Sequence, residues 1–378
     1  MMNNGIRRSA AMLILLFIFV MAACNSTGKG NENETVDNPV IDTTIEPIAT
    51  IEPSPEPTPM PYTAPLTGIG RETEASERPI AVMINNLGPA RPQSGLTEAD
   101  VVWEVLAEGG ITRLVAIFQS TDNITATIGP IRSNRAYLID IADSFGAVMA
   151  HAGSSPEGYS ILQNQRKPYL DEISNAGTYF WRSTDRKAPH NLYSDLEKLR
   201  TGAEKKGYVK KDQVPVYVFS ETGSATGGQA AKAFELTFSL KSYRVGYQYD
   251  ETAGLYKRFI NDDPHIDKNN DEQLSATNLI VFETTHKTLD NVGRLYIDLE
   301  TGGEAYLFQQ GKMIEVDWVR SSDGMVRILK DGAEVSLLPG KTYIHVVPNK
   351  PALAEHIKWV QIENTGDAIS VTGGSSEN

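Results

Sequence analysis

The pattern of apolar and polar positions after residue 65 divides the chain into two parts. In the first part, short continuous apolar runs alternate with segments that carry apolar residues at helical spacing. Such runs are typical of strands covered on both faces, and the spaced segments of amphipathic helices. The runs lie at 79–84, 101–107 (a strand or a short helix), 111–118 and 146–150, and the predicted helices at 134–145, 155–163 and 194–206. Their alternation predicts an α/β domain over residues 66–206.

The second part has short apolar stretches separated by turn signals such as Asp323-Gly324 and Asp331-Gly332. Predicted strands lie at 214–219, 234–239, 243–249, 255–260, 279–284, 295–299, 305–309, 325–329 and 343–347. This spacing predicts a mostly antiparallel β domain, a sandwich or barrel, over residues 213–363, with a Gly/Ser-rich tail at 364–378. The expected fold class is α+β overall.

The N-terminus carries an export signal. Arg7 and Arg8 precede an apolar run that ends at Ala23, and the only cysteine, Cys24, follows directly. The run is too short for a membrane span and typical of a secretory signal. We therefore predict a lipoprotein signal peptide over 1–23 and lipidation of Cys24, with palmitate among the chains, which anchors the protein to the extracytoplasmic face of a bacterial cell membrane. An uncleaved anchor, a free thiol and twin-arginine export are the weaker alternatives.

Residues 24–65 are predicted to be a disordered tether. They hold no aromatic residue before Tyr62, and prolines alternate from Pro53 to Pro61. Such a stretch cannot bury enough apolar surface to fold, and alternating prolines favour an extended spacer. The alternative is a proline-rich recognition peptide.

The composition of the chain limits the classes of partner that it can bind. The formal net charge of −13 becomes −15 once Arg7 and Arg8 leave with the signal, so nucleic acid is a poor partner. With Cys24 lipidated, no cysteine remains for a disulfide, and the body must be held by its core. The membrane is therefore reached through lipid on Cys24, and not through bulk charge.

Five short polar segments in the first part, which we call polar islands, hold residues that could bind a ligand or catalyse a reaction. They are 91–96, 104 with 108–113, 129–135, 151–155 and 185–193. Loops that follow strands gather at one edge of an α/β sheet, where ligands usually bind. Guanidinium groups and backbone N–H groups suit an anion such as phosphate or carboxylate. The candidate ligand-binding residues are Arg113, Arg132, Ser133, Arg135, His151, Ser154, Arg186, Lys187, His190 and Asn191.

Three alternatives stay open. In a purely structural interpretation, Ser133 and Ser155 are helix N-caps, and Arg113 and Arg135 pair with Glu104 and Glu108. In a catalytic one, His151 or His190 is a general base and Ser154 a candidate hydroxyl, although the spacing shows no triad and no Gly-x-Ser-x-Gly motif. No metal-ligand spacing is present, so we expect neither a metal nor a cofactor, and the loop Asp263–Asp271 is at most a weak calcium site.

Several of these islands resemble a known family. Arg-Pro-Gln-Ser-Gly-Leu at 91–96, Glu-Gly-Gly-Ile-Thr-Arg at 108–113, Gly-Pro-Ile-Arg-Ser at 129–133 and Arg-Lys-Ala-Pro-His-Asn-Leu-Tyr at 186–193 are similar to motifs of the YerB-like lipoproteins of Gram-positive bacteria. The resemblance covers nearly all of residues 66–350. It implies two domains of unknown function behind a lipoprotein signal and no particular activity. Where such proteins carry His-Gly-Gly-Ser or similar, this chain has His151-Ala152-Gly153-Ser154.

Two function classes follow. The first is a membrane-anchored module that binds an anionic cell-envelope ligand, such as a cell-wall polymer, or a wall-enzyme partner. The second is an envelope hydrolase or transferase that acts on a glycan or phosphodiester through His151 or His190. A concave basic site favours the first class, and a histidine within reach of a nucleophile favours the second.

If Cys24 is only an anchor, the exchange Cys24→Ser releases the protein from the membrane and leaves its body folded. Cell fractionation followed by circular dichroism of the released protein checks this expectation. A released body that is unfolded would contradict the division into tether and body.

Overall fold

The computed structural model describes residues 60–209, 214 and 216–360. The predicted signal peptide, Cys24, most of the tether and the C-terminal tail lie outside these residues. Strands predominate in the described part, and the fold is α+β, as predicted. The α-helices are α1 (Ala136–Ser144), α2 (Pro156–Asn164) and α3 (Leu196–Lys205). None of the described helices is long and apolar enough to cross a membrane.

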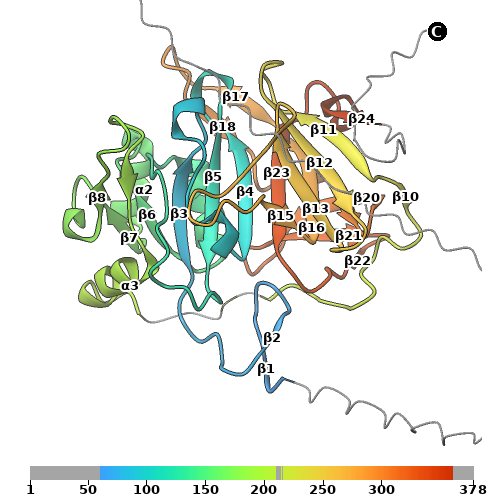
Figure 1. Ribbon diagram of the computed structural model, residues 1–378. Helices are drawn as coiled ribbons and strands as arrows, with labels where there is room; N and C mark the ends of the chain where they lie inside the picture. The colour runs from blue at the N-terminus through green and yellow to red at the C-terminus, as the bar shows by residue number, and fades with distance from the viewer. Residues whose placement is uncertain (1–59, 210–213, 215, 361–378) are drawn as a thin grey trace, which may run out of the picture. The chain divides into compact units, whose positions relative to one another are not determined.

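A large mixed sheet runs through both parts of the body (Figure 1). In spatial order its strands are β22 (Ala333–Glu334), β21 (Val326–Lys330), β20 (Lys312–Arg320), β19 (Gly303–Gln309), β16 (Asn278–Thr284), β23 (Thr342–Pro348), β4 (Val101–Leu106), β5 (Thr112–Phe118), β3 (Ile80–Asn85), β6 (Val148–His151) and β7 (Tyr169–Asp171), with β10 (Gln229–Ala230) beside β20. The predicted parts meet where β23 pairs in parallel with β4. They therefore share one sheet.

A second sheet is antiparallel and lies entirely in the second part. Its strands are β14 (Asp263–Pro264), β13 (Leu255–Ile260), β12 (Arg244–Asp250), β11 (Ala233–Thr237) and β24 (Ile357–Trp359), with β15 (Ser275–Ala276) beside β13. Small two-stranded sheets are formed by β1 (Tyr62–Thr63) with β2 (Gly70–Arg71), β8 (Trp181–Arg182) with β9 (Leu192–Tyr193), and β17 (His286–Thr288) with β18 (Leu295–Ile297).

The large sheet is covered on both faces, which explains its continuous apolar runs. All six residues of β3 are buried. Ile80, Val82 and Ile84 share a core with the second sheet and α3, whereas Ala81 and Met83 share a core with α1. A strand between two cores must be apolar at successive positions, because neither face reaches water.

The predicted helices are confirmed to within two residues at each end, and most predicted strands are present. The strand predicted at 214–219 is wrong where it is described: among residues 216–219, only Phe219 forms an isolated bridge, with Leu337. The sequence pattern missed β20, because its exposed face carries Glu315 and Asp317. The tether was expected to reach residue 65, yet Tyr62–Thr63 already pairs with β2. The buried side chains of Ala64 and Leu66 hold this segment against the body.

A buried ion pair joins the large sheet to the second sheet. Glu104 of β4 and Arg258 of β13 are each 1% exposed, and Arg258 Nη2 lies 2.7 Å from Glu104 Oε2. The other carboxylate oxygen of Glu104 accepts hydrogen bonds from Thr112 and Tyr243. Burial opposes ionisation of Glu104, but the charge of Arg258 and hydrogen bonds from His345 and Tyr243 hold its pKa well below the ordinary value.

Two histidines complete this network. Tyr247 accepts from Arg258 and donates to His345 Nε2, which leaves His345 Nδ1–H facing Glu104 Oε2 at 3.3 Å. Arg258 Nε donates to His265 Nδ1, and His265 Nε2 donates to Gln93. Burial lowers the pKa of both histidines, so both are neutral at pH 7. The network fixes the position of β4 relative to the second sheet.

The exchange Glu104→Gln should lower the free energy of unfolding by about 3–5 kcal/mol, because it leaves the Arg258 charge buried without a counter-ion. Urea unfolding at pH 7 measures this loss, and Glu251→Gln, which removes the exposed partner of Lys232, is the matched control with a small effect.

Since the folded-state pKa of Glu104 is depressed, its stabilisation is present above about pH 4.5 and lost as the pH falls below that value. The difference between wild type and Glu104→Gln should therefore narrow in acid. Equal stability at pH 7 would contradict the role of the pair.

Candidate functional site

The polar islands meet at one edge of the large sheet. β3 and β6 are parallel and end at this edge, β4 also ends there, and antiparallel β5 begins there. The edge therefore collects Asn85 at the end of β3, Glu108 after β4, Arg113 at the start of β5, and His151 at the end of β6. This is the convergence expected from the alternation of strands and loops.

The segment 129–134 lies across this edge in extended form. Asn85 N donates to Pro130 O and Arg132 N donates to Met83 O on one side, and Ala152 N donates to Arg132 O on the other. Gly129 opens the segment at a φ of 150°, where a Cβ atom would lie 2.7 Å from Leu192 O. Only glycine fits this position, and it directs the following arginines to the edge of the sheet.

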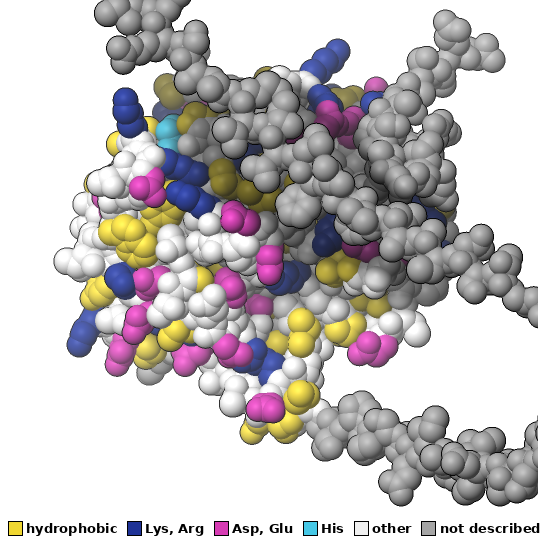
Figure 2. Space-filling view, in the orientation of Figure 1, with side chains coloured by type: hydrophobic (Ala, Val, Ile, Leu, Met, Phe, Trp, Pro, Cys, Tyr) yellow, Lys and Arg dark blue, Asp and Glu magenta, His cyan; other side chains and the backbone are white. Residues whose placement is uncertain are grey.

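Three arginines form the centre of the site, which we call the guanidinium cluster: Arg113, Arg132 and Arg135. Arg113 is 4% exposed and donates to Ser133 O, while its Nε is buried without a partner. Arg135 pairs with Glu108. Arg132 is half-buried, and its guanidinium makes no hydrogen bond or ion pair with any described residue. Figure 2 shows Lys and Arg side chains near a histidine at the upper left of the body.

The cluster carries unbalanced positive charge. Burial and the charge of Arg135 lower the pKa of Arg113 to about 10. Burial and the same charge lower the pKa of Arg132. Glu108 is the one described carboxylate that favours the charged form of either group. Three guanidinium groups against one carboxylate leave a net charge of +2, which an anion would balance.

His190 borders the cluster in a defined tautomer. Leu87 N donates to Asn85 Oδ1, so the Asn85 amide presents its NH2 group to His190 Nδ1 at 2.8 Å. His190 Nδ1 is therefore an acceptor, and Nε2 carries the proton. Burial and the charges of Arg132 and Arg186 lower the pKa of His190. At neutral pH this ring is an uncharged N–H donor beside the cluster.

His151 is fully buried and has a different environment. Its Nδ1 donates to Gly153 O and lies 3.5 Å from Asp171, and its ring stacks on Tyr169. Burial lowers its pKa to about 4, so it stays neutral. Neither its buried Nε2 nor the hydroxyl of Ser154 has a hydrogen-bond partner among the described residues. No described contact joins either histidine to a serine, so the catalytic prediction gains no support from the geometry.

The remaining predicted residues lie in the loop between β8 and β9. Arg186 donates to Ala90 O, Pro92 O and Tyr193 Oη, so its guanidinium is occupied in holding the loop near Arg91. Asn191 is likewise engaged, with Ser183 O and Arg182. Lys187 is exposed. Asn85, which orients His190, was missed because it ends an apolar strand and carries no motif of its own.

The structural alternatives are confirmed in part. Arg135 pairs with Glu108, and Ser155 caps α2 by accepting from Gly158 N. Ser133 does not cap α1, whose N-cap is Arg135. Glu104 pairs with Arg258 and not with Arg113, because the second sheet packs over the end of β4.

Asp267, in the loop considered as a weak calcium site, connects that loop to the segment 95–97. Both carboxylate oxygens of Asp267 accept hydrogen bonds, from Gly95 N and Asn269 N on one and from Thr97 on the other. No group of three or more metal-ligating side chains occurs among the described residues.

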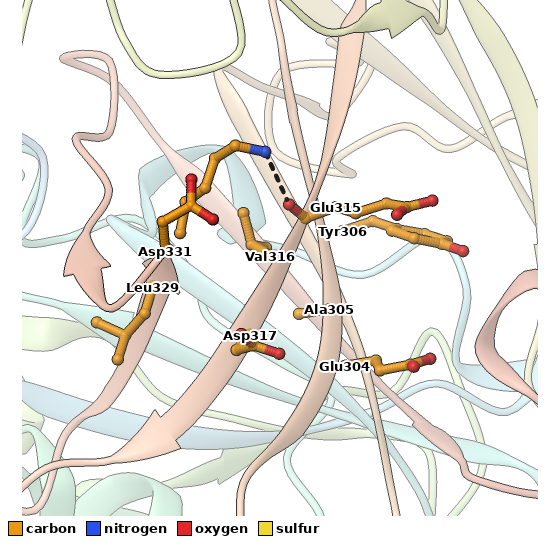
Figure 3. A pocket seen from close by; sticks show the side chains of 9 residues that line it. Glu304, Ala305, Tyr306, Glu315, Val316, Asp317, Leu329 and Asp331 are labelled. Atoms are coloured by element: carbon orange, nitrogen blue, oxygen red, sulfur yellow. Dashed lines mark hydrogen bonds between the residues drawn. The ribbon is translucent and has the colours of Figure 1, made fainter.

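A concave surface elsewhere on the body is acidic. A cavity of about 320 Å³ on β19, β20 and β21 is lined by Glu304, Glu315, Asp317 and Asp331, with Tyr306 between them. Figure 3 shows these carboxylates around the strands, with Lys330 donating to Glu315 O. Glu304 lies directly opposite Asp317. This groove would repel an anion and is separate from the guanidinium cluster.

The exchange Asn85→Asp should raise the pKa of His190 above its wild-type value, because a carboxylate beside Nδ1 stabilises the imidazolium. Nuclear magnetic resonance titration of the histidines measures this shift, and His286, whose pKa burial lowers to about 4, serves as an internal control that should not move. An unchanged His190 pKa would contradict the contact with Asn85.

The chain is similar to known proteins over both parts of the body. Residues 66–209 match the family described as the N-terminal domain of a protein of unknown function (DUF3048), and residues 234–344 match the corresponding C-terminal domain. A protein of Bacillus subtilis (strain 168) described as "Putative lipoprotein YerB" is 37% identical over 292 residues, which are 76% of this chain and 87% of the relative.

The fold agrees with this similarity. The crystal structure of the YerB protein from Bacillus subtilis superposes with a TM-score of 0.71 at 35% identity, covering 78% of this chain and 98% of that chain. Identity at this level over three quarters of the chain exceeds a likeness of fold alone. The chain therefore belongs to the YerB-like family, whose two domains are described as domains of unknown function.

Proposed function

We propose that this protein is a lipoprotein anchored through Cys24 to the extracytoplasmic face of the membrane, and that its guanidinium cluster binds an anionic ligand of the cell envelope. The observation that carries the proposal is Arg132, which is half-buried beside two other arginines and makes no ion pair with a described residue, because Glu108, the one carboxylate whose charge acts on it, pairs with Arg135. Placing such a charge near like charges is costly unless a ligand offsets it.

The chemistry of the site favours binding over catalysis. Arg113 and Arg132 offer N–H groups that no described side chain accepts, and His190 adds a neutral donor at Nε2. These groups can hold the oxygens of a phosphate or carboxylate through charge-assisted hydrogen bonds. A cell-wall polymer with phosphate or carboxylate groups presents such oxygens outside the membrane. A wall enzyme that presents an acidic segment would use the same donors.

The exchange Arg132→Gln should weaken retention on isolated wall material at least tenfold, because it removes one charge-assisted hydrogen bond of about 1.5–3 kcal/mol. The assay uses exported Cys24→Ser protein and co-sedimentation with purified walls. Arg166→Gln is the matched control: it removes the same charge from an exposed position in the turn between α2 and β7, and should bind as the parent does. Retention of Arg132→Gln at the level of Arg166→Gln would contradict the proposal.

A further inference from the structure

An exposed aliphatic side chain borders the guanidinium cluster. Ile173 follows β7 and is 69% exposed. Its Cδ1 lies 3.1 Å from the point where a Cβ atom on Gly153 would stand, and Ser133 Oγ lies 4.0 Å from the same point. Ile173 N donates to Asp171 Oδ1, so the loop is held with this side chain outward. The side chains of Ile173 and Ser133, the residue that follows Arg132, therefore both lie close to Gly153.

A second aliphatic side chain, from the loop between β11 and β12, packs against the loop between β4 and β5. Leu240 is 39% exposed, and its Cγ lies 2.9 Å from the Cβ position of Gly110. Gly110 has a φ of 74° and ends the turn that begins at Glu108, the partner of Arg135. Aliphatic surface therefore also borders the β4–β5 loop, but on the other side of the cluster from Ile173, because β5, β3 and β6 separate β4 from β7.

Two carboxylates at this rim are already ion-paired, and a third, Asp171, is buried and accepts hydrogen bonds from Gly153 N, Tyr159 and Ser174. Glu172, next to Ile173, lies 3.0 Å from Arg182 Nη2, and Arg182 in turn donates to Asn191 beside His190. Glu108 pairs with Arg135. Neither carboxylate is left to repel an anion, and the net charge of +2 at the cluster matches a phosphomonoester, which carries about −1.5 to −2 at pH 7. A carboxylate would balance only half of it.

We propose that the ligand of this site is an alkyl phosphate, a phosphomonoester that carries an aliphatic chain, and this inference rests on the proposed anion-binding function. The phosphate oxygens accept from Arg113, Arg132 and His190, and the chain lies on Ile173. The same chemistry is offered by a soluble phosphorylated amphiphile and by a phosphomonoester lipid headgroup at a bilayer surface.

The test is isothermal titration of full-chain Cys24→Ser protein with inorganic phosphate and with hexyl phosphate. Hexyl phosphate should bind about tenfold more tightly than inorganic phosphate, because burying about two methylene groups contributes a free energy of that size. Ile173→Ser should abolish this gain and leave the affinity for inorganic phosphate unchanged. Ile69→Ser, which removes an exposed isoleucine (47% exposed, against 69% for Ile173) between β1 and β2, is the matched control and should keep the gain. Arg132→Gln should weaken both ligands.

The outcomes separate the two proposals. Equal affinity for the two ligands, or a gain that survives in Ile173→Ser, overturns the alkyl preference and leaves the anion site standing. Failure of both ligands to bind overturns both proposals. Sedimentation with phosphatidylcholine vesicles that contain phosphatidic acid distinguishes the sources: binding that depends on Ile173 supports a headgroup at a bilayer, and hexyl phosphate binding without vesicle binding supports a soluble ligand.

Discussion

The buried ion pair between Glu104 and Arg258 is the constraint on which the arrangement of the body depends. Two charges are removed from water there, and that cost is offset only if every donor and acceptor is matched. Thr112 and Tyr243 satisfy one oxygen of Glu104, while Arg258 and His345 face the other. These contacts hold the second sheet against the large sheet in the observed register.

The same network reaches the candidate site through hydrogen bonds. Arg258 donates to His265, His265 donates to Gln93, and Gln93 donates to Asn85 O. The Asn85 side chain then orients His190. The tautomer of His190 and the position of the edge loops are thus supported by the interface between the sheets. A ligand site needs such support if its donors are to be held in place before the ligand arrives.

Sequence patterns predicted what depends on local order and missed what depends on distant partners. The apolar run of β3 and the helical spacing of α1 were sufficient to predict these two elements. A strand buried on both faces is apolar at successive positions, and a helix buried on one face is apolar at regular intervals. The parallel pairing of β23 with β4 could not be predicted, since it joins segments more than 200 residues apart. In the structural alternative Glu104 pairs with a nearby arginine, but its partner is 154 positions away. The gathering of the islands followed from topology, whereas the contact of Asn85 with His190, 105 positions apart, had no trace in the sequence.

The protein is strongly acidic, with a formal net charge of −13, yet the edge of its large sheet holds three arginines against one carboxylate. Whether this edge receives an anion is tested most directly by a crystal structure of the protein soaked with tungstate, a heavy-atom analogue of phosphate. The guanidinium cluster predicts an anomalous peak within hydrogen-bond distance of Arg132 and His190. A well-occupied peak elsewhere with none at Arg132, or no peak at all, would contradict the anion site.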